Sequence, residues 1–446
     1  MQKFFILFLF FFCSLNFSSA QNRFIIQNKK QSDKIGFKLI NNLMVVPVEV
    51  NGVELSFILD TGVSKPIIFN FLNVSDTLKI KNTETFFIRG LGAGEPVEAL
   101  KSSGNIFRIG DAIKLDQDLY AVYGLGMNFG PRLGVPIHGI IGLDLFRDFV
   151  VEINYISKYI KLTEPHKYKY KSCKKCERFN LEFYNDKPYI NGKVSLNNKV
   201  IPVKLLIDSG GSDSLWLFED DSLGIDSGDK FFRDFLGHGL SGSVYGKRGK
   251  AASFLLKSFE LKEPNVAYPD ATSIVFAKKV KGRNGSMSGN ILKRFNIIMD
   301  YRNSLITLKK NKNFNEKFRY NKSGIELAHN GVRFVKEYEA IKYRFNENQG
   351  NSANNDGVRI VFDRQYKMAL KPAYAIVELR EGSPAEKAGL QKGDVVLSIN
   401  GKSTHQLSLQ QIMIMFYGHS GKFMKLKVER DTRVLSYSFK LESLLE

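Results

Sequence analysis

The chain has 446 residues, 43% of them hydrophobic, so it is long enough for two or three domains with cores of their own. Its formal net charge is +20, but Lys occurs in every region rather than on one motif-bearing helix or strand. This spread argues against a specific nucleic-acid-binding protein and favours solubility together with attraction to anionic surfaces.

The first 20 residues are typical of a signal peptide. Lys3 is followed by an apolar run from Phe4 to Phe12, and Ser18-Ser19-Ala20 supplies small residues before a cleavage point. An uncleaved membrane anchor is the alternative, but the apolar run is short for a span. We therefore expect an exported protein, located in the periplasm, at the cell surface or outside the cell, with no transmembrane span in the mature chain.

Two stretches share one arrangement, in which an apolar run leads an Asp into a tight Gly turn. Residues 57–62 read Phe-Ile-Leu-Asp-Thr-Gly, and residues 205–210 read Leu-Leu-Ile-Asp-Ser-Gly. Such a run suits a buried strand that ends at an interior turn, where a small Thr or Ser and a Gly let two turns approach each other. One copy would be weak evidence, because Asp-Thr-Gly also occurs at ordinary strand-to-turn junctions.

The repeat continues beyond these two turns. About 80 residues after each Asp, similar segments begin at Gly142 and Gly289 and lead to Tyr155 and Tyr301. The offset is 148 residues between the two Asp, 147 between the two Gly and 146 between the two Tyr. Nearly constant offsets predict two duplicated lobes that differ by small insertions or deletions.

These residues resemble the aspartic peptidases, and most closely the retropepsin-like bacterial members, of Bacteroidetes type, that carry a C-terminal PDZ domain. The resemblance covers roughly residues 30–446. It implies a mainly β, two-lobed pepsin/retropepsin-like fold followed by a PDZ domain. The expected boundaries are a first lobe at 30–165, a linker at 166–180, a second lobe at 181–312 and the PDZ domain at 320–446.

In this family each lobe gives one Asp to a shared catalytic dyad, here Asp60 and Asp208. The resemblance also implies that the residues after each Asp support the catalytic loops and that Ile140-Ile141-Gly142 braces the first of them. The supporting residues are Thr61, Gly62, Ser209 and Gly210.

The chemistry explains why two Asp are needed. Carboxylates about 3 Å apart cannot both ionise, so the pair shares one proton and divides into a base that activates water and an acid that protonates the leaving group. The water attacks the peptide carbonyl of a polypeptide substrate without a covalent intermediate. We expect no metal and no cofactor, and the sequence contains no His-Glu-x-x-His motif.

Glycine-rich segments follow each Asp by about 30 residues and resemble flaps that close over a substrate. Neither contains the Tyr of pepsin-like flaps, so the likeness is to the retroviral type. The alternative is a surface hairpin without ligand contact, but the recurrence of the segment in both lobes favours a flap. The flap residues are Gly90, Gly92 and Gly94 in the first lobe and Gly237, His238 and Gly239 in the second.

Cys173 and Cys176 lie in the basic linker as Cys-Lys-Lys-Cys. An exported protein favours a local disulfide over a thiol pair, and a zinc site would need four ligands. We expect a structural disulfide, with an incidental pair as the alternative.

The C-terminal region strongly resembles a bacterial PDZ domain. Ser383-Pro384 opens a short helix that Gly389 ends, and Asn400-Gly401 suits a tight hairpin. The first strand is expected at Gly324–Leu327, with an inserted loop around 346–357. Residues 408–417 have a Ser cap and the apolar spacing of the helix that walls a peptide groove, with simple packing on a core as the alternative. The expected groove residues for a peptide or protein tail are Leu409, Ile412 and Met413.

Two other functions remain open. The chain could be a catalytically inactive two-lobed peptide-binding protein that retains the cleft. Asp208-Ser209-Gly210-Gly211 also resembles the nucleophile loop of trypsin-like serine peptidases, with His138 or His166 as the upstream His. That alternative leaves the duplication around Asp60 unexplained.

The residue that follows each Asp-Thr-Gly or Asp-Ser-Gly motif predicts the pH range in which the expected enzyme is active. Pepsin-like enzymes have a hydroxyl there, which donates a hydrogen bond to a catalytic carboxylate and favours its ionised form. Val63 and Gly211 cannot donate such a bond. The apparent pKa values of the pair should therefore be higher, and activity should extend to mild acid or near-neutral pH.

Overall fold

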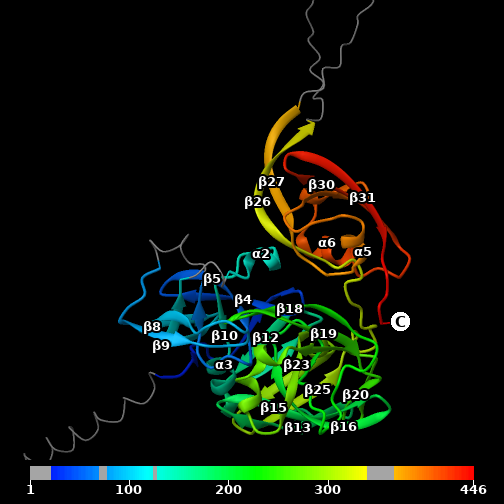
Figure 1. Cartoon of the computed structure of the whole chain (residues 1–446). Helices are drawn as coiled ribbons and strands as arrows, with labels where there is room; N and C mark the ends of the chain where they lie inside the picture. Colours follow the sequence, from blue (N-terminus) through cyan, green and yellow to red (C-terminus); the bar gives the residue numbers. More distant parts are fainter. Residues whose placement is uncertain (1–21, 70–77, 124–127, 339–365, 446) are drawn as a thin grey trace, which may run out of the picture.

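The fold is mainly β, as expected from the sequence. A computed structural model describes residues 22–69, 78–123, 128–338 and 366–445 (Figure 1). The expected signal peptide at 1–20 and the expected loop at 346–357 lie outside the described residues. In Figure 1 the first lobe (blue and cyan) and the second lobe (green) lie side by side, and the PDZ domain (orange and red) lies above them.

The first lobe is built on a nine-stranded sheet. At its centre β10 pairs parallel with β5, which places Ile141 beside Leu59. The helices α2 (Gly130–Leu133) and α3 (Leu143–Asp148) flank β10 in the chain. The strands are β1 (Ile25–Ile26), β3 (Lys38–Ile40), β4 (Leu43–Val50), β5 (Val53–Leu59), β6 (Ile67–Ile68), β7 (Thr83–Ile88), β8 (Val97–Ile109), β9 (Ala112–Val122) and β10 (Gly139–Ile141).

The second lobe repeats this plan in a ten-stranded sheet. Its β23 pairs parallel with β16 and places Ser288 beside Asp208, as β10 does for β5. The short helices are η5 (Ala271–Ile274), η6 (Ala277–Lys279) and α4 (Gly289–Leu292). The strands are β14 (Glu182–Tyr184), β15 (Lys187–Leu196), β16 (Lys199–Asp208), β17 (Leu215–Leu217), β18 (Phe232–Gly239), β19 (Gly242–Lys250), β20 (Ser253–Leu256), β21 (Phe259–Lys262), β22 (Asn265–Pro269) and β23 (Arg283–Ser288).

A third sheet of six strands joins the lobes, in the order β13-β25-β24-β11-β12-β2. The first lobe contributes β2, β11 and β12, the second lobe contributes β24 and β25, and β13 comes from the segment between the lobes; β11 pairs antiparallel with β24 at the centre. One buried apolar cluster contains residues of both lobes. The strands are β2 (Ser32–Gly36), β11 (Val150–Asn154), β12 (Tyr159–Thr163), β13 (Cys176–Asn180), β24 (Phe295–Asp300) and β25 (Leu305–Lys310).

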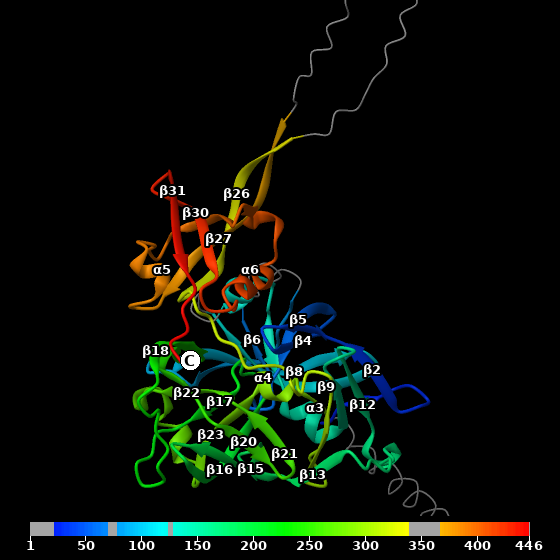
Figure 2. The same ribbon diagram turned by 90° about the vertical axis from the view of Figure 1, so that its right-hand side faces the viewer.

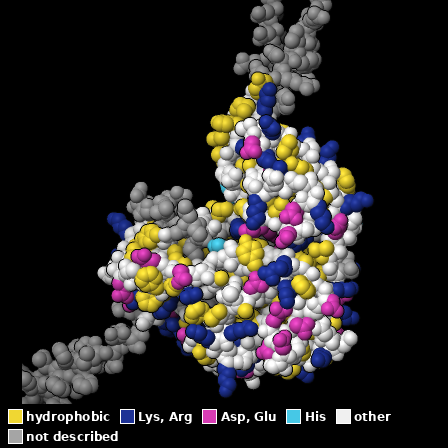
Figure 3. All heavy atoms as spheres, viewed as in Figure 1, with side chains coloured by type: hydrophobic (Ala, Val, Ile, Leu, Met, Phe, Trp, Pro, Cys, Tyr) yellow, Lys and Arg dark blue, Asp and Glu magenta, His cyan; other side chains and the backbone are white. Residues whose placement is uncertain are grey.

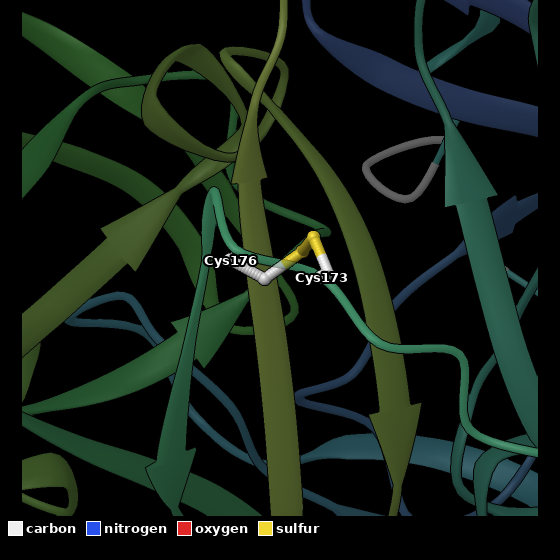
Figure 4. Close-up of a disulfide and its surroundings, with 2 residues drawn as sticks. All are labelled: Cys173 and Cys176. Atoms are coloured by element: carbon white, nitrogen blue, oxygen red, sulfur yellow. A yellow bond between two sulfur atoms is a disulfide. The ribbon is translucent and has the colours of Figure 1, made fainter.

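The segment between the lobes contains the helix η4 (Pro165–Lys167) and leads into β13. A disulfide joins Cys173 to Cys176 just at the start of this strand, with the two sulfur atoms 1.95 Å apart (Figure 4). The expected local disulfide is therefore confirmed.

The PDZ domain has a six-stranded sheet, in which β26 is an edge strand paired with β27. The side chain of Ser383 caps α5, and Ser408 forms a capping box with Gln411 at the start of α6. Asn400 and Gly401 have the positive φ angles of a tight turn, 49° and 81°. The elements are β26 (Ile325–Tyr338), β27 (Tyr366–Leu379), α5 (Pro384–Lys387), β28 (Val395–Ile399), β29 (Lys402–Ser403), η7 (Thr404–Gln406), α6 (Leu409–Met415), β30 (Phe423–Arg430) and β31 (Arg433–Lys440).

The PDZ domain follows the second lobe in the chain but also contacts the first lobe (Figure 2). Helix α2 packs against β26. The Arg132 guanidinium forms an ion pair with Glu378 at 3.1 Å. A Cβ built on Gly134 would lie 2.7 Å from the Cβ of Leu409, so the end of α2 touches the start of α6.

Lys and Arg side chains are spread over both lobes and the PDZ domain on the face shown in Figure 3. This distribution agrees with the dispersal of Lys along the sequence. In the part of the chain that the structure describes, no helix has the length and apolar character needed to cross a membrane.

Candidate active site

The ends of β5 and β16 bring Asp60 and Asp208 together. Asp60 N donates to Ile141 O on the bracing strand at 2.8 Å, which fixes the first loop. Gly62 N donates to Asp60 Oδ1 at 2.6 Å, and Gly210 N donates to Asp208 Oδ1 at 3.1 Å. A Cβ on Gly210 would overlap the Asp60 carboxyl group, and a Cβ on Gly62 would lie 3.7 Å from Asp208 Oδ1. The absence of a side chain at Gly210 therefore allows the Asp60 carboxyl group to lie against the second loop.

Reciprocal hydrogen bonds hold the two loops together. Thr61 Oγ1 donates to Ile207 O at 2.6 Å and accepts from Ser209 N at 3.0 Å. Ser209 Oγ donates to Leu59 O at 2.8 Å and accepts from Thr61 N at 3.0 Å. Both side chains are buried, with 2% of each residue exposed. Thr61 and Ser209 thus each bind the backbone of the opposite lobe, and these four hydrogen bonds fix the position of the two Asp loops relative to each other.

Replacing Thr61 by Val should destabilise the fold. The substitution preserves shape but removes the hydroxyl, which leaves the Ser209 amide and the Ile207 carbonyl without this partner at a cost of roughly 1–3 kcal/mol each. Chemical denaturation of the full chain measures the loss, with Thr61→Ser as the matched control that retains the hydroxyl. Equal stability of the two variants would show that the bonds contribute nothing.

Burial and mutual repulsion set the electrostatics of the pair. Burial, followed by the negative charge of Asp208, raises the pKa of Asp60 to about 7. Burial also raises the pKa of Asp208, while the positive charges of Arg283 and Lys187 oppose this rise. The pair therefore retains a proton well above the usual range of Asp.

Lys187 and Arg283 are site residues that the sequence analysis missed. Lys187 begins β15, directly after the turn at residues 185–186, and Arg283 begins β23. Burial lowers the pKa of both side chains; the negative charges of Asp60 and Asp208 partly offset this effect at Lys187, and Tyr189 followed by Asp208 does so at Arg283. The internal repeat could have revealed Lys187, because it begins its strand as Leu43 begins β4 in the first lobe.

The flap residues from both lobes meet above the dyad. Gly94 N donates to Ser241 O at 2.8 Å, and Ser241 N donates to Leu91 O at 2.9 Å. A Cβ on Gly92 would overlap Ser241 O, and a Cβ on Gly239 would overlap Leu91 O. The glycines therefore allow the two tips to touch, and both lobes contribute to the cover of the site.

The other flap residues lie in the same region. A Cβ on Gly90 would lie 2.7 Å from the Cβ of Leu240, whereas a Cβ on Gly237 would meet no atom within 4 Å. The His238 ring makes an edge contact with Phe129, with the ring centroids 6.0 Å apart.

A cavity of about 1740 Å³ contains both Asp and extends to the PDZ domain. The flap residues 86–91 and 236–240 line it, as do Leu409 and Met413 of α6. Ile412, the third residue expected in the PDZ groove, is fully buried in the PDZ core. The cavity that contains the two Asp and the α6 side of the PDZ domain therefore share one space.

The loop at Ser209 does not have the geometry of a serine nucleophile. Its hydroxyl is occupied by the bonds to Leu59 and Thr61. His138 accepts a bond from Ser56 N at 3.1 Å, and His166 contacts the Gln31 side chain at 2.9 Å. Neither His is bonded to Ser209, so the structure does not support a serine peptidase.

Comparison with known families agrees with this geometry. Residues 46–145 match the aspartyl protease family model, and residues 376–430 match the PDZ domain model. The first match lies in the first lobe and contains Asp60. The likeness of the second lobe depends on the internal repeat and on the matching strand order. No curated protein matches the chain.

Proposed function

We propose that this chain, which carries an aspartyl protease domain and a C-terminal PDZ domain, is an exported aspartic endopeptidase with Asp60 and Asp208 as its catalytic dyad. The observation that supports this function best is the pair of carboxyl groups on the cavity lining, whose loops are held together by the buried side chains of Thr61 and Ser209. Export is supported by the character of residues 1–20 and by the disulfide between Cys173 and Cys176.

The proposed mechanism follows from the shared proton. With one proton on the pair, the ionised carboxylate accepts a proton from a water molecule as that water attacks the peptide carbonyl. The protonated carboxyl donates its proton to the departing nitrogen. The raised pKa of Asp60 maintains this state near neutral pH. The touching flaps exclude bulk water above the scissile bond.

The PDZ domain implies peptide binding, and we propose that it selects segments of substrates or partners. Its edge strand β26 can pair with an extended peptide, a common mode of peptide recognition. The shared cavity supports this proposal, because Leu409 and Met413 of α6 line the same space as the dyad.

A turnover assay separates the peptidase from an inactive two-lobed peptide-binding protein. The full chain is incubated with an unfolded protein substrate across a range of pH, with and without a statine-containing peptide that mimics the tetrahedral intermediate. We expect cleavage that the mimic stops, because a transition-state mimic binds the dyad more tightly than substrate does. Binding of the mimic without turnover at any pH would instead identify a binding protein.

A further inference from the structure

The charges at the floor of the cleft do not balance. When the dyad shares one proton it carries one negative charge, whereas Lys187 and Arg283 carry two positive charges beside it. Both cations line the cavity together with Asp60 and Asp208. Over the whole cavity lining, Lys and Arg side chains also outnumber Asp and Glu side chains. The floor therefore has an excess of positive charge that the dyad does not neutralise.

Strand register places Lys187 directly beside the dyad. In the second lobe the paired stretch of β15 and β16 ends at Tyr189 and Leu206, and Lys187 and Asp208 lie two residues beyond this pair, at the same end of the two strands. In the first lobe the paired stretch of β4 and β5 ends at Val45 and Ile58, and Leu43 and Asp60 lie two residues beyond this pair. The duplicated lobes thus differ at this position, with an aliphatic side chain on one side and a cation on the other.

The turn before β15 holds Lys187 at the junction of the lobes. Asn185 and Asp186 form this turn with φ angles of 47° and 61°, and Ser64 Oγ donates to Asn185 O at 3.4 Å. Among the residues that the structure describes, Lys187 has no carboxylate within ion-pair distance and no hydrogen-bond acceptor. A partly buried ammonium without a partner is costly, and its lowered pKa reflects this cost. A ligand that supplies an acceptor would remove the cost.

Arg283 is fixed in orientation but retains free donor capacity. Its Nε donates to Gly285 O at 3.1 Å, and its Nη2 donates to Ser286 Oγ at 2.9 Å. The guanidinium lies 5.2 Å from the centroid of the Phe218 ring. The Tyr189 hydroxyl is a third neighbour of the guanidinium, which has five N–H groups in all, and no carboxylate of the described residues forms an ion pair with it. The remaining donors suit the planar oxygens of a carboxylate.

We propose that Lys187 and Arg283 form a subsite that binds the side chain of an acidic residue, Asp or Glu, close to the scissile bond of the substrate. The proposal rests on the proposed peptidase function and specifies its substrate class. A carboxylate in this subsite pairs with both cations, whereas the isosteric amide of Gln leaves the Lys187 ammonium without a charged partner. We expect a peptide with Glu in the subsite to bind with a Kd roughly tenfold lower than the same peptide with Gln, which is the usual scale of a charge-assisted hydrogen bond.

Binding measurements test the subsite independently of turnover. The ligands are hexapeptides with statine at the centre and an amidated C-terminus. They are made in pairs that carry Glu or Gln at one position, and each pair tests a different position. The two members of a pair therefore differ only in one side-chain carboxylate. Calorimetry gives Kd for each Glu/Gln pair with the full wild-type chain. We expect one position at which Glu binds roughly tenfold more tightly than Gln. Lys187→Met should abolish this preference, and Lys187→Arg should retain it.

A matched control uses another cation of the same strand pair. Lys204 lies on β16 and forms an ion pair with Glu182 at 2.6 Å, so Lys204→Met should keep the Glu preference. If the wild-type chain binds the Glu and Gln peptides equally well at every position, the proposed subsite is wrong, even if the chain cleaves substrates. A Lys187→Met variant that shifts the pH profile of cleavage but keeps the Glu/Gln ratio would also overturn the subsite. A Glu preference without turnover would support the subsite and refute the peptidase.

Discussion

Asp60→Asn and Asp208→Asn will each abolish cleavage of an unfolded protein substrate, with a loss in kcat of roughly 10³-fold or more. Asn has the shape of Asp but cannot accept a proton from the attacking water, and a pair with one carboxyl group no longer shares a proton. The measurement is the initial rate of cleavage by the full chain. Retained activity in either variant would end the dyad assignment.

Two controls separate a loss of chemistry from a loss of folding. Asp118→Asn changes a partly exposed Asp that lies 3.8 Å from Lys65, and it should leave the rate unchanged. The Asp60→Asn variant should be at least as stable as the wild type at pH 7, because it removes a buried carboxyl whose ionisation opposes folding. A dyad variant that unfolds at a lower temperature than the wild type would contradict this account of the site.

Activity should be high at mildly acid pH and fall as the pH rises through about 7. The pKa of Asp60 is about 7, so above this value the pair loses the proton that the leaving nitrogen needs. A pH profile of kcat/KM for one fixed peptide measures the fall, which should approach tenfold per pH unit. An optimum confined to strongly acid pH would contradict the raised pKa.

The same pKa makes stability depend on pH. In the folded chain Asp60 retains its proton up to about pH 7, whereas in the unfolded chain it loses it near the ordinary value of 3.8. Between these values the folded state binds more protons, so the contribution of Asp60 to stability is present below pH 3.8 and is lost as the pH rises through 7. Unfolding experiments at pH 4 and pH 7 should show a smaller pH dependence for Asp60→Asn than for the wild type.

Local sequence was enough to predict the main elements of the site. The run from Phe57 to Gly62 contains a buried strand, a carboxylate and a turn in consecutive residues, so its structure depends little on the rest of the chain. The second copy of the motif then predicted a partner for it. The contact of Thr61 with Ser209 follows from the approach of two such turns. The higher pKa expected relative to pepsin-like enzymes stays a prediction; relative to an ordinary Asp, the pKa of both carboxyl groups is raised, with burial as the largest cause.

Features that depend on distant packing were not predicted. Lys187 comes near the dyad through the pairing of β15 with β16. Arg283 begins its strand well before Ser288 and reaches the site through a long side chain. The contact between α2 and β26 joins segments about 200 residues apart and has no local sequence signal. Cys176–Asn180 lies in the expected linker, yet its pairing with β25 adds it to the shared sheet.

The central pair of the six-stranded sheet, β11 and β24, joins the two lobes by one ladder of backbone hydrogen bonds. Were the halves separated, each would present an open edge strand, which is a template for pairing with any exposed strand nearby. Covalent fusion keeps the correct partner at high local concentration, because the two halves belong to one molecule. The chain is in this sense a tethered dimer of its own halves. Such a dimer can vary one half alone, as the change from Leu43 to Lys187 illustrates, whereas two identical subunits would have to change together.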